Sequence, residues 1–433
     1  MSDQGPSKVQ DASRTEGGWL ILADDLSGAA DCAVGAARSG LESVVLWGLQ
    51  TQARPEQVVA IDADTRYAPA ARAAERQAGL WQLYTGAGAP PRRLYKKIDS
   101  TLRGNFAAEM AALRAAGVAI VASAYVAAGR TVVDGRVLVQ GRPLEASEVW
   151  AHEGLRGEAH LPTLLEAQGL RCAHLPLSLI RSALAQRLDD LLRSGQVDAI
   201  VCDSETEADL QAIAQATVGL PVYWVGSAGL IAHLPVAADG AGQGRLFPAR
   251  VTVQGAVLTV VGSLSSVSRT QAARLAAQAP VRVVSVAAEL LRVGETHALW
   301  PAVAAQVADA LGQGHDLLIQ TESEAHTGLL HGPALTQALG RLIGPWADAV
   351  GALIATGGET AHGLLPFLGA TGLRIVREIE AGAPLSLALG PRAFPVVTKA
   401  GAFGHPDTLL HCHTELAALR PAATPSLSEH SED

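Results

Sequence analysis

The sequence predicts an α/β protein of two domains, each with a largely parallel sheet flanked by helices and with the active site in the cleft between them. Short apolar runs rich in Val, Ile and Leu alternate with longer Ala-rich segments, which is typical of strand–helix repeats. The chain has 433 residues, enough for two or three domains. A small, Gly-rich segment, 237–246, separates two complete series of such elements and predicts a linker.

The first series predicts a domain over residues 18–238. Its expected strands are 19–23, 43–47, 58–61, 94–98, 118–122, 199–203 and 221–225. Its expected helices are 28–39, 70–84, 107–116, 182–194 and 207–218. Because the two kinds of element alternate, the strands are expected to lie parallel with helices on the faces of the sheet.

The second series predicts a domain over residues 247–420. Its expected strands are 257–261, 281–286, 316–320, 352–355 and 394–398. Its expected helices are 268–277, 300–311, 331–343 and 361–368. The ends, 1–17 and 421–433, are rich in Ser, Pro, Asp and Glu, which predicts disordered tails.

Charge and hydropathy exclude two classes of partner. The formal net charge is −9, and no run of Lys and Arg suggests the basic face of a nucleic-acid-binding protein. No apolar run reaches the ~20 residues that a membrane-spanning helix needs, and the N-terminus lacks the apolar core of a signal peptide. We therefore expect a cytoplasmic protein without nucleic-acid or membrane partners. The oligomeric state stays open, with a homodimer as one alternative.

Two adjacent acids, Asp24 and Asp25, follow the first expected strand. Open parallel sheets bind ligands outside the carboxyl ends of their strands. Neighbouring carboxylates repel each other, so these two are candidates for orienting a hydroxyl, holding a metal ion or accepting a proton. Successive strand residues face opposite sides, so only one is expected to reach a ligand directly. The alternative is that they cap the following helix.

A second cluster, KKIDSTLRGN at 96–105, carries four charged and three other hydrogen-bonding side chains directly after a strand. Lys and Arg pair with carboxylates, whereas Asp and Ser bind hydroxyls, so the cluster suits a small polyol acid. The alternative is a solvated loop. Arg66 follows another strand, and Arg130 precedes Asp134-Gly135, which predicts a hairpin turn. These two arginines are weaker candidates, because an exposed Arg is the ordinary case.

Three Gly-rich turns follow strands of the second half: 262–265, 356–361 and 399–404. Free backbone N–H groups at such turns favour phosphate, although each is also consistent with an ordinary turn. None is a Walker loop, because no G-K-[ST] follows. His411 and His413 are expected on the face of a terminal helix, and no metal site built by side chains is predicted.

Seven motifs, in this order, resemble those of the four-carbon acid sugar kinase family. They are ADDLSGAAD, KKIDSTLRGN, GRTVVDG, GSAGL, GSLSSVSRTQ, TGGETA and KAGAFG. Together they extend over nearly the whole chain, from about Trp19 to His413. Ser27 stands where the family usually has Thr, which keeps a hydroxyl there.

The resemblance implies an acid-sugar-binding N-terminal domain and a nucleotide-binding C-terminal domain. It implies transfer of the γ-phosphoryl group of ATP to the terminal hydroxyl of an acid such as threonate, erythronate or 3-oxo-tetronate. Mg²⁺ is expected with ATP because the charge of the phosphates requires it. The implied acid contacts are Asp25, Arg66, Lys97, Ile98, Asp99 and Ser100, to which the clusters above add Asp24, Arg103 and Arg130. The implied nucleotide contacts are Ser263, Gly357, Gly358, Glu359, Thr360 and Gly404.

We expect Asp25 to accept the proton of the substrate hydroxyl, with Asp99 as the competing candidate. Two other functions stay open. A Mg²⁺-dependent phosphatase using Asp24 and Asp25 is disfavoured, because no acid stands two positions after Asp25 as D-x-D would require. A two-domain sensor of an acidic metabolite would explain a cleft but not the Gly-rich turns. Acid-dependent ADP release distinguishes the three.

Overall fold

The computed structural model describes residues 18–48, 56–86, 89, 91–152, 156–234, 251–262, 265–322, 333–401 and 403–421. The expected N-terminal tail, the expected linker and all but the first residue of the expected C-terminal tail lie outside these ranges. Ser263 also lies outside them. Among the described residues, no helix is long and apolar enough to cross a bilayer.

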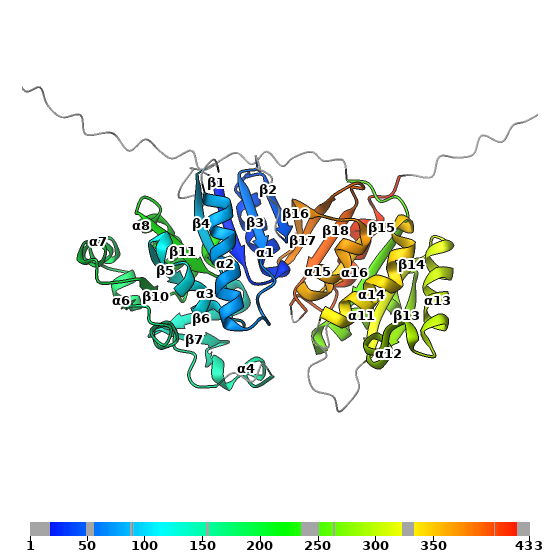
Figure 1. Cartoon of the computed structure of the whole chain (residues 1–433), viewed down its shortest axis with the longest axis horizontal. Helices are drawn as coiled ribbons and strands as arrows, with labels where there is room; N and C mark the ends of the chain where they lie inside the picture. Colours follow the sequence, from blue (N-terminus) through cyan, green and yellow to red (C-terminus); the bar gives the residue numbers. More distant parts are fainter. Residues whose placement is uncertain are drawn as a thin grey trace, which may run out of the picture.

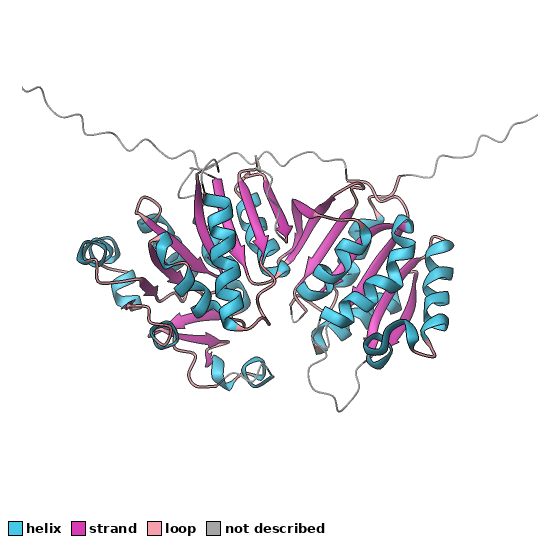
Figure 2. Cartoon of the chain, viewed as in Figure 1, coloured by secondary structure: helices cyan, strands magenta, loops and turns pink. Residues whose placement is uncertain are grey.

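Within the described ranges, fifteen strands form one continuous twisted sheet (Figures 1 and 2). In spatial order they are β13 (Val281–Ala287), β14 (Asp316–Glu322), β12 (Ala256–Val261), β15 (Val350–Thr356), β18 (Pro395–Lys399), β17 (Ala383–Leu389), β16 (Gly372–Glu380), β2 (Ser43–Trp47), β3 (Val58–Asp62), β1 (Gly18–Ala23), β4 (Arg92–Lys97), β11 (Val222–Gly226), β5 (Val118–Ala122), β10 (Ala199–Cys202) and β9 (Cys172–Leu175). We call the part up to residue 234 the first half and the part from residue 251 the second half.

Helices cover the sheet on both faces (Figure 2). In the first half they are α1 (Leu26–Arg38), α2 (Ala70–Thr85), α3 (Phe106–Ala112), α4 (Glu148–His152), α5 (Leu161–Glu166), α6 (Leu177–Ile180), α7 (Leu184–Ser194), α8 (Glu207–Thr217) and α9 (Ala228–Ile231). In the second half they are α11 (Ser266–Gln278), α12 (Ala288–Val293), α13 (Trp300–Gly312), α14 (Pro333–Ile343), α15 (Gly358–Leu364) and α16 (Thr408–Ala417).

The predicted fold class is confirmed, because most neighbouring strands pair in parallel. The predicted strands appear within about two residues of their expected bounds. This accuracy has a physical cause: strands of a parallel sheet are covered on both faces, so they are continuous apolar runs. In β1, for example, every residue from Trp19 to Ala23 is fully buried.

The two halves share one sheet, a feature that the sequence did not predict. β16 pairs antiparallel with β2, for example Leu373 with Val45. β16 also pairs antiparallel with β17, and β17 with β18. The register between β16 and β17 shifts twice, and such irregularities bend strands and increase their twist. The halves are therefore joined edge to edge by backbone hydrogen bonds.

Helix α1 lies at this junction and contacts β2, β3 and β16 as well as α15 (Figure 1). One cluster of buried apolar side chains extends through both halves, including Leu46 of β2 and Leu373 of β16. A second cluster fills the space between α11, α16 and the other face of the second half. The two halves therefore share part of one apolar core.

A small antiparallel sheet of β6 (Arg130–Val133), β7 (Arg136–Val139) and β8 (Arg142–Pro143) lies beside the first half. Val133 pairs with Arg136, so the hairpin turn predicted at Asp134-Gly135 is confirmed. Both turn N–H groups donate to Asp203 at the end of β10, over 2.7 and 2.9 Å. The hairpin that carries Arg130 is thus anchored to the main sheet.

Candidate active site

A cavity of about 1130 Å³ lies between the two halves, where strands from both of them end. Residues from the ends of β1, β3 and β4 form one wall, and residues after β12, β15 and β18 form the other. The predicted site residues on these walls are Asp24, Asp25, Arg66, Lys97, Asp99, Ser100, Arg103 and Arg130 from the first half, and Gly357, Gly358, Glu359 and Thr360 from the second half.

Arg66 bridges the two adjacent acids of the first wall. Its guanidinium donates to Asp24 over 2.8 and 2.9 Å and to Asp25 over 2.7 and 2.9 Å. Burial works to raise the pKa of Asp24, yet the charge and hydrogen bonds of Arg66, together with the charges of Lys96 and Lys97, lower that pKa overall. Both acids line the cavity, although only one was expected to reach it. Asp25 also accepts from Gly28 N–H, so it caps α1 as well.

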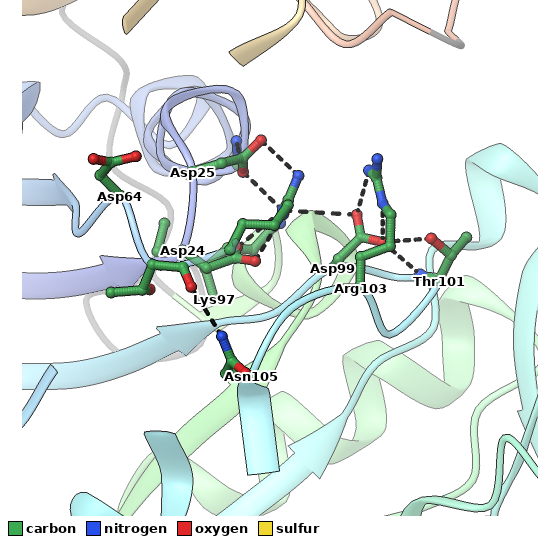
Figure 3. A network of polar contacts seen from close by, with 12 residues as sticks. Asp24, Asp25, Asp64, Lys97, Asp99, Thr101, Arg103 and Asn105 are labelled. Atoms are coloured by element: carbon green, nitrogen blue, oxygen red, sulfur yellow. Dashed lines mark hydrogen bonds and ion pairs between the residues drawn. The ribbon is translucent and has the colours of Figure 1, made fainter. Parts of the chain in front are cut away.

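Asp99 is held by its own loop. Arg103 donates to both of its carboxylate oxygens, over 2.9 and 3.0 Å, and Thr101 donates to it through its backbone N–H and its hydroxyl. Figure 3 shows these contacts of Asp99 with Arg103 and Thr101. Burial works to raise the pKa of Asp99, but the charges of Arg103 and Arg66 hold it well below its ordinary value.

Lys97 and Arg130 differ from these paired arginines. Both line the cavity, and neither has an ion-pair partner within 4.0 Å among the described residues. Lys97 is only 5% exposed. Burial works to lower its pKa, yet Cys32 and the three acids Asp25, Asp24 and Asp99 nearby raise it, so the ammonium stays charged. A buried cation without a direct partner is suited to an incoming anion.

Lys96, the neighbour of Lys97, points to the opposite side of β4 and has a structural role. It pairs with Glu109 of α3 over 2.8 Å, and both side chains are fully buried. Glu109 also accepts from Thr65, which precedes Arg66. The alternation of strand side chains thus separates a structural lysine from one on the cavity wall.

On the second wall, the Gly357-Gly358 turn lies directly against the acids of the first. A Cβ atom on Gly358 would lie 2.8 Å from Asp25 Oδ2 and 3.1 Å from Ser27 Oγ. Gly357 adopts φ +95°, a left-handed conformation that favours glycine, and its N–H donates to Lys399 O over 2.7 Å. Only a residue without a side chain fits at Gly358, so the backbone of the turn faces the cavity.

The loop after β18 is held by Lys399. Its ammonium is buried and donates to Ala400 O and Phe403 O, each over 2.8 Å. Burial lowers its pKa to about 8. Ser265 and Ser268 donate their hydroxyls to Gly401 O and so tie the loop to the start of α11. The expected lysine of this turn therefore organises the backbone and does not itself face the cavity.

Two predicted site residues are not on the cavity walls. Ile98 is 1% exposed, and its N–H donates to Gly226 O in the sheet. Gly404 adopts φ +91° and packs against Gln271 and Thr408 behind the loop. Their predicted ligand contacts stay predictions.

The walls also carry residues that were not predicted as site residues, among them Ser27, Asp31, Tyr125 and His362. The Ser27 hydroxyl is buried and has no hydrogen-bond partner among the described residues. Burial raises the pKa of Asp31 to about 7. Ser27 and Asp31 stand four positions apart and so share a face of α1, a spacing that was visible in the sequence. Tyr125 stacks on Phe403 across the cavity, 6.0 Å between ring centroids, a contact without a sequence signal.

Family models match both halves of the chain. A model described as a sugar-binding N-terminal domain matches residues 19–234. A model described as a nucleotide-binding C-terminal domain matches residues 258–409. The boundary between the two matches falls at the 235–250 segment, which the structure does not describe.

Full-length relatives agree with these matches. D-threonate kinase of Cupriavidus necator is 45% identical, over 93% of this chain and 99% of its own. 3-oxo-tetronate kinase of Methylobacterium radiotolerans is 31% identical, over 89% of this chain and 96% of its own. A crystal structure of a Salmonella typhimurium LT2 protein matches with TM-score 0.75 and 25% identity, over 92% of this chain and 98% of that one. The chain therefore belongs to the four-carbon acid sugar kinase family.

Proposed function

We propose that the chain transfers the γ-phosphoryl group of ATP to the terminal (4-) hydroxyl of a four-carbon acid sugar, with D-threonate as the preferred acid. Membership of the kinase family supports the reaction class. The preference for D-threonate is supported by the 45% identity to a D-threonate kinase, against 31% to a 3-oxo-tetronate kinase.

One observation carries the proposal. A carboxylate from one half, which matches the sugar-binding model, touches the glycine turn of the other half, which matches the nucleotide-binding model. Gly358 contacts Asp25 at the boundary between the two walls of a single cavity. Phosphoryl transfer depends on bringing donor and acceptor into line and neutralising charge. A phosphate chain at this turn would place its terminal group beside an acceptor held near Asp25.

The acid carboxylate is assigned to Lys97 and Arg130. Both are cations on the cavity wall without an ion-pair partner among the described residues. Arg66 and Arg103 were the other candidates, but their guanidinium groups already bind Asp24, Asp25 and Asp99. Recruiting either arginine to the substrate would cost a buried ion pair, whereas Lys97 and Arg130 offer their charge without that loss.

Asp25 is assigned as the proton acceptor. It lies against the Gly358 turn, and Arg66 balances its charge and that of Asp24. Asp99 is the weaker candidate, because Arg103 and Thr101 occupy its oxygens and its pKa lies well below the ordinary value. The Ser27 hydroxyl lies beside the same turn, and it is buried without a hydrogen-bond partner among the described residues. It is therefore available to donate to a phosphate oxygen.

Mg²⁺ fits this site as a companion of ATP. The described residues contain no cluster of three or more His, Cys, Asp or Glu side chains that could hold a metal ion by themselves. Mg²⁺ is commonly held by phosphate oxygens, water and one or two carboxylates. Glu359, which follows the glycine turn and lines the cavity, would supply such a carboxylate. When bound, the ion neutralises phosphate charge.

The test is ADP release by the full chain with a panel of four-carbon acids. We expect ADP formation that depends on the acid, with the highest kcat/KM for D-threonate, and a product phosphorylated at the 4-hydroxyl by ³¹P and ¹³C NMR. If ADP release is equal with and without acid, a four-carbon acid is not the phosphoryl acceptor. Inorganic phosphate released from a sugar-acid phosphate would favour a phosphatase. Tight acid binding without turnover would favour a sensor.

A further inference from the structure

An ion pair joins the two halves beside the cavity. His362 on α15 lies with its Nδ1 2.8 Å from Oδ2 of Asp62, which ends β3, although the two residues are 300 positions apart. The Asp62 side chain is only 2% exposed. Its other oxygen accepts from Asp64 N–H over 2.8 Å, so the carboxylate is fixed by its own loop. His362 therefore links α15 of the second half to a carboxylate of the first half that its own loop holds in place.

The pair acts on the same helix that carries the glycine turn. His362 stands four residues after Gly358, so the two lie on one face of α15. At one end of this face, Gly358 only touches Asp25 and Ser27 and has no side chain to hold it there. One turn further on, His362 makes a directional, charge-assisted hydrogen bond. The ion pair therefore supplies the attachment that the glycine contact lacks.

We propose that His362 and Asp62 are positioning residues that fix the glycine turn of α15 against Asp25. Their kinetic role rests on the proposed kinase function, whereas the attachment itself does not. His362 does not need to touch either substrate for this role. Its loss would misalign donor and acceptor and lower kcat, while the contacts that bind the acid and the nucleotide would remain.

The charges around His362 favour the protonated ring. Asp62 and Asp64 face it from the loop after β3, with Asp64 Oδ2 3.9 Å from Nε2, and Arg76 opposes them from α2. Burial works to lower the pKa of His362, yet the hydrogen bond and charge of Asp62 raise it above the ordinary value. A raised histidine pKa means that the attachment is complete below the ordinary histidine pKa and weakens as pH rises through the raised one.

A second ion pair between the halves provides a matched control. Arg38 of α1 pairs with Glu378 of β16, but Arg38 is 59% exposed and neither residue lines the cavity. Arg38→Ala therefore removes a cross-half ion pair without touching α15. If breaking either pair lowers kcat, the cause is a weaker attachment between the halves in general. If only breaking the His362 pair lowers kcat, the cause is the position of α15.

The kinetic experiment compares His362→Ala, His362→Asn, Asp62→Asn and Arg38→Ala. Misplacement of reacting groups by ~1 Å costs ~10²-fold, so we expect His362→Ala to lower kcat by about 10- to 100-fold with the KM of acid and ATP changed much less. His362→Asn keeps an N–H donor and should recover part of kcat. Arg38→Ala should leave kcat unchanged. Wild-type kcat in His362→Ala, or an equal loss in Arg38→Ala, overturns the proposal.

A second experiment does not depend on turnover. The His362 ring is titrated by NMR in the full chain labelled at histidine, and its signal among 13 histidines is identified by its absence from His362→Asn. We expect a pKa above the ordinary ~6.5 that falls back in Asp62→Asn. A pKa that is unchanged by Asp62→Asn overturns the attachment. A raised pKa in a chain that releases no ADP with any acid supports the attachment and refutes the proposed function.

Discussion

The cations of the cavity differ in whether a carboxylate already pairs with them. This difference decides whether a mutation should affect substrate binding or stability. Lys97→Met removes a charge-assisted hydrogen bond worth about 1.5–3 kcal/mol to the acid, so we expect its KM to rise by about 10- to 100-fold while the KM of ATP stays the same. Steady-state kinetics with each substrate varied in turn measures this. An unchanged KM for the acid would remove Lys97 from the carboxylate site.

Arg66→Met should act on stability. Removing the guanidinium leaves Asp24 and Asp25, with side chains 3% and 15% exposed, without their shared partner. Breaking such a buried pair costs about 3–5 kcal/mol, which urea unfolding would reveal as a lower midpoint. A variant of normal stability with a high KM for the acid would instead assign Arg66 to substrate binding.

Asp25→Asn tests the proton acceptor. Asn keeps the shape of the side chain and can still cap α1, but it cannot accept a proton. We expect kcat to fall by about 10²–10⁴-fold, as measured by coupled ADP release. Asp99→Asn is the comparison, because Asp99 was the competing candidate. A near-normal kcat in Asp25→Asn would reject the assignment.

Asp31 should make stability depend on pH. Burial raises its pKa from 3.8 to about 7, so the folded protein holds this proton more tightly than the unfolded chain does. The contribution of Asp31 to the free energy of unfolding therefore falls as pH rises from about 4 to about 7. Urea unfolding across this range should show a shallower decline in Asp31→Asn than in the wild type. Parallel pH profiles would contradict the raised pKa.

At the level of elements, α15 begins where only glycine fits. A Cβ on Gly358 would lie 2.8 Å from Asp25 Oδ2, so Gly358→Ala should push the turn away from the acid and lower kcat by at least about 10²-fold. Gly79→Ala is the matched control, because a Cβ there meets nothing within 4 Å in the middle of α2. It should stabilise the helix by about 0.5–1 kcal/mol and leave kcat unchanged. Normal activity in Gly358→Ala would contradict the contact.

Elements differed in how far the sequence predicted them. β1, β2 and β5 are short apolar runs, and their predicted bounds agree with the structure to within one residue. β16 was missed because its sequence, GLRIVREIE, carries four charged residues and is only partly buried along most of its length. Such a partly exposed antiparallel strand lacks the continuous apolar run that marks a strand buried in a parallel sheet. Local composition therefore did not reveal it.

At the level of the whole molecule, one sheet and one apolar cluster run through both halves. We therefore expect a single cooperative unfolding transition in calorimetry.

Gly372→Val should uncouple the halves, because a Cβ there would lie 2.7 Å from Leu46 Cδ2 in the β2–β16 junction. Two separate unfolding transitions in the unmodified chain would contradict the coupling of the halves. Two separate transitions in Gly372→Val would support that coupling.

What could be read from the amino-acid order was local. Apolar runs located the strands, and the polar residues that follow them, such as Asp25, Lys97 and Gly358, were recognised because parallel sheets bind ligands at strand ends. Partnerships were not readable, because they join distant residues. Arg66 reaches Asp25 across 41 positions, and His362 reaches Asp62 across 300. Which cation stays available, and how the halves meet, depends on distances in space that periodicity and composition do not encode.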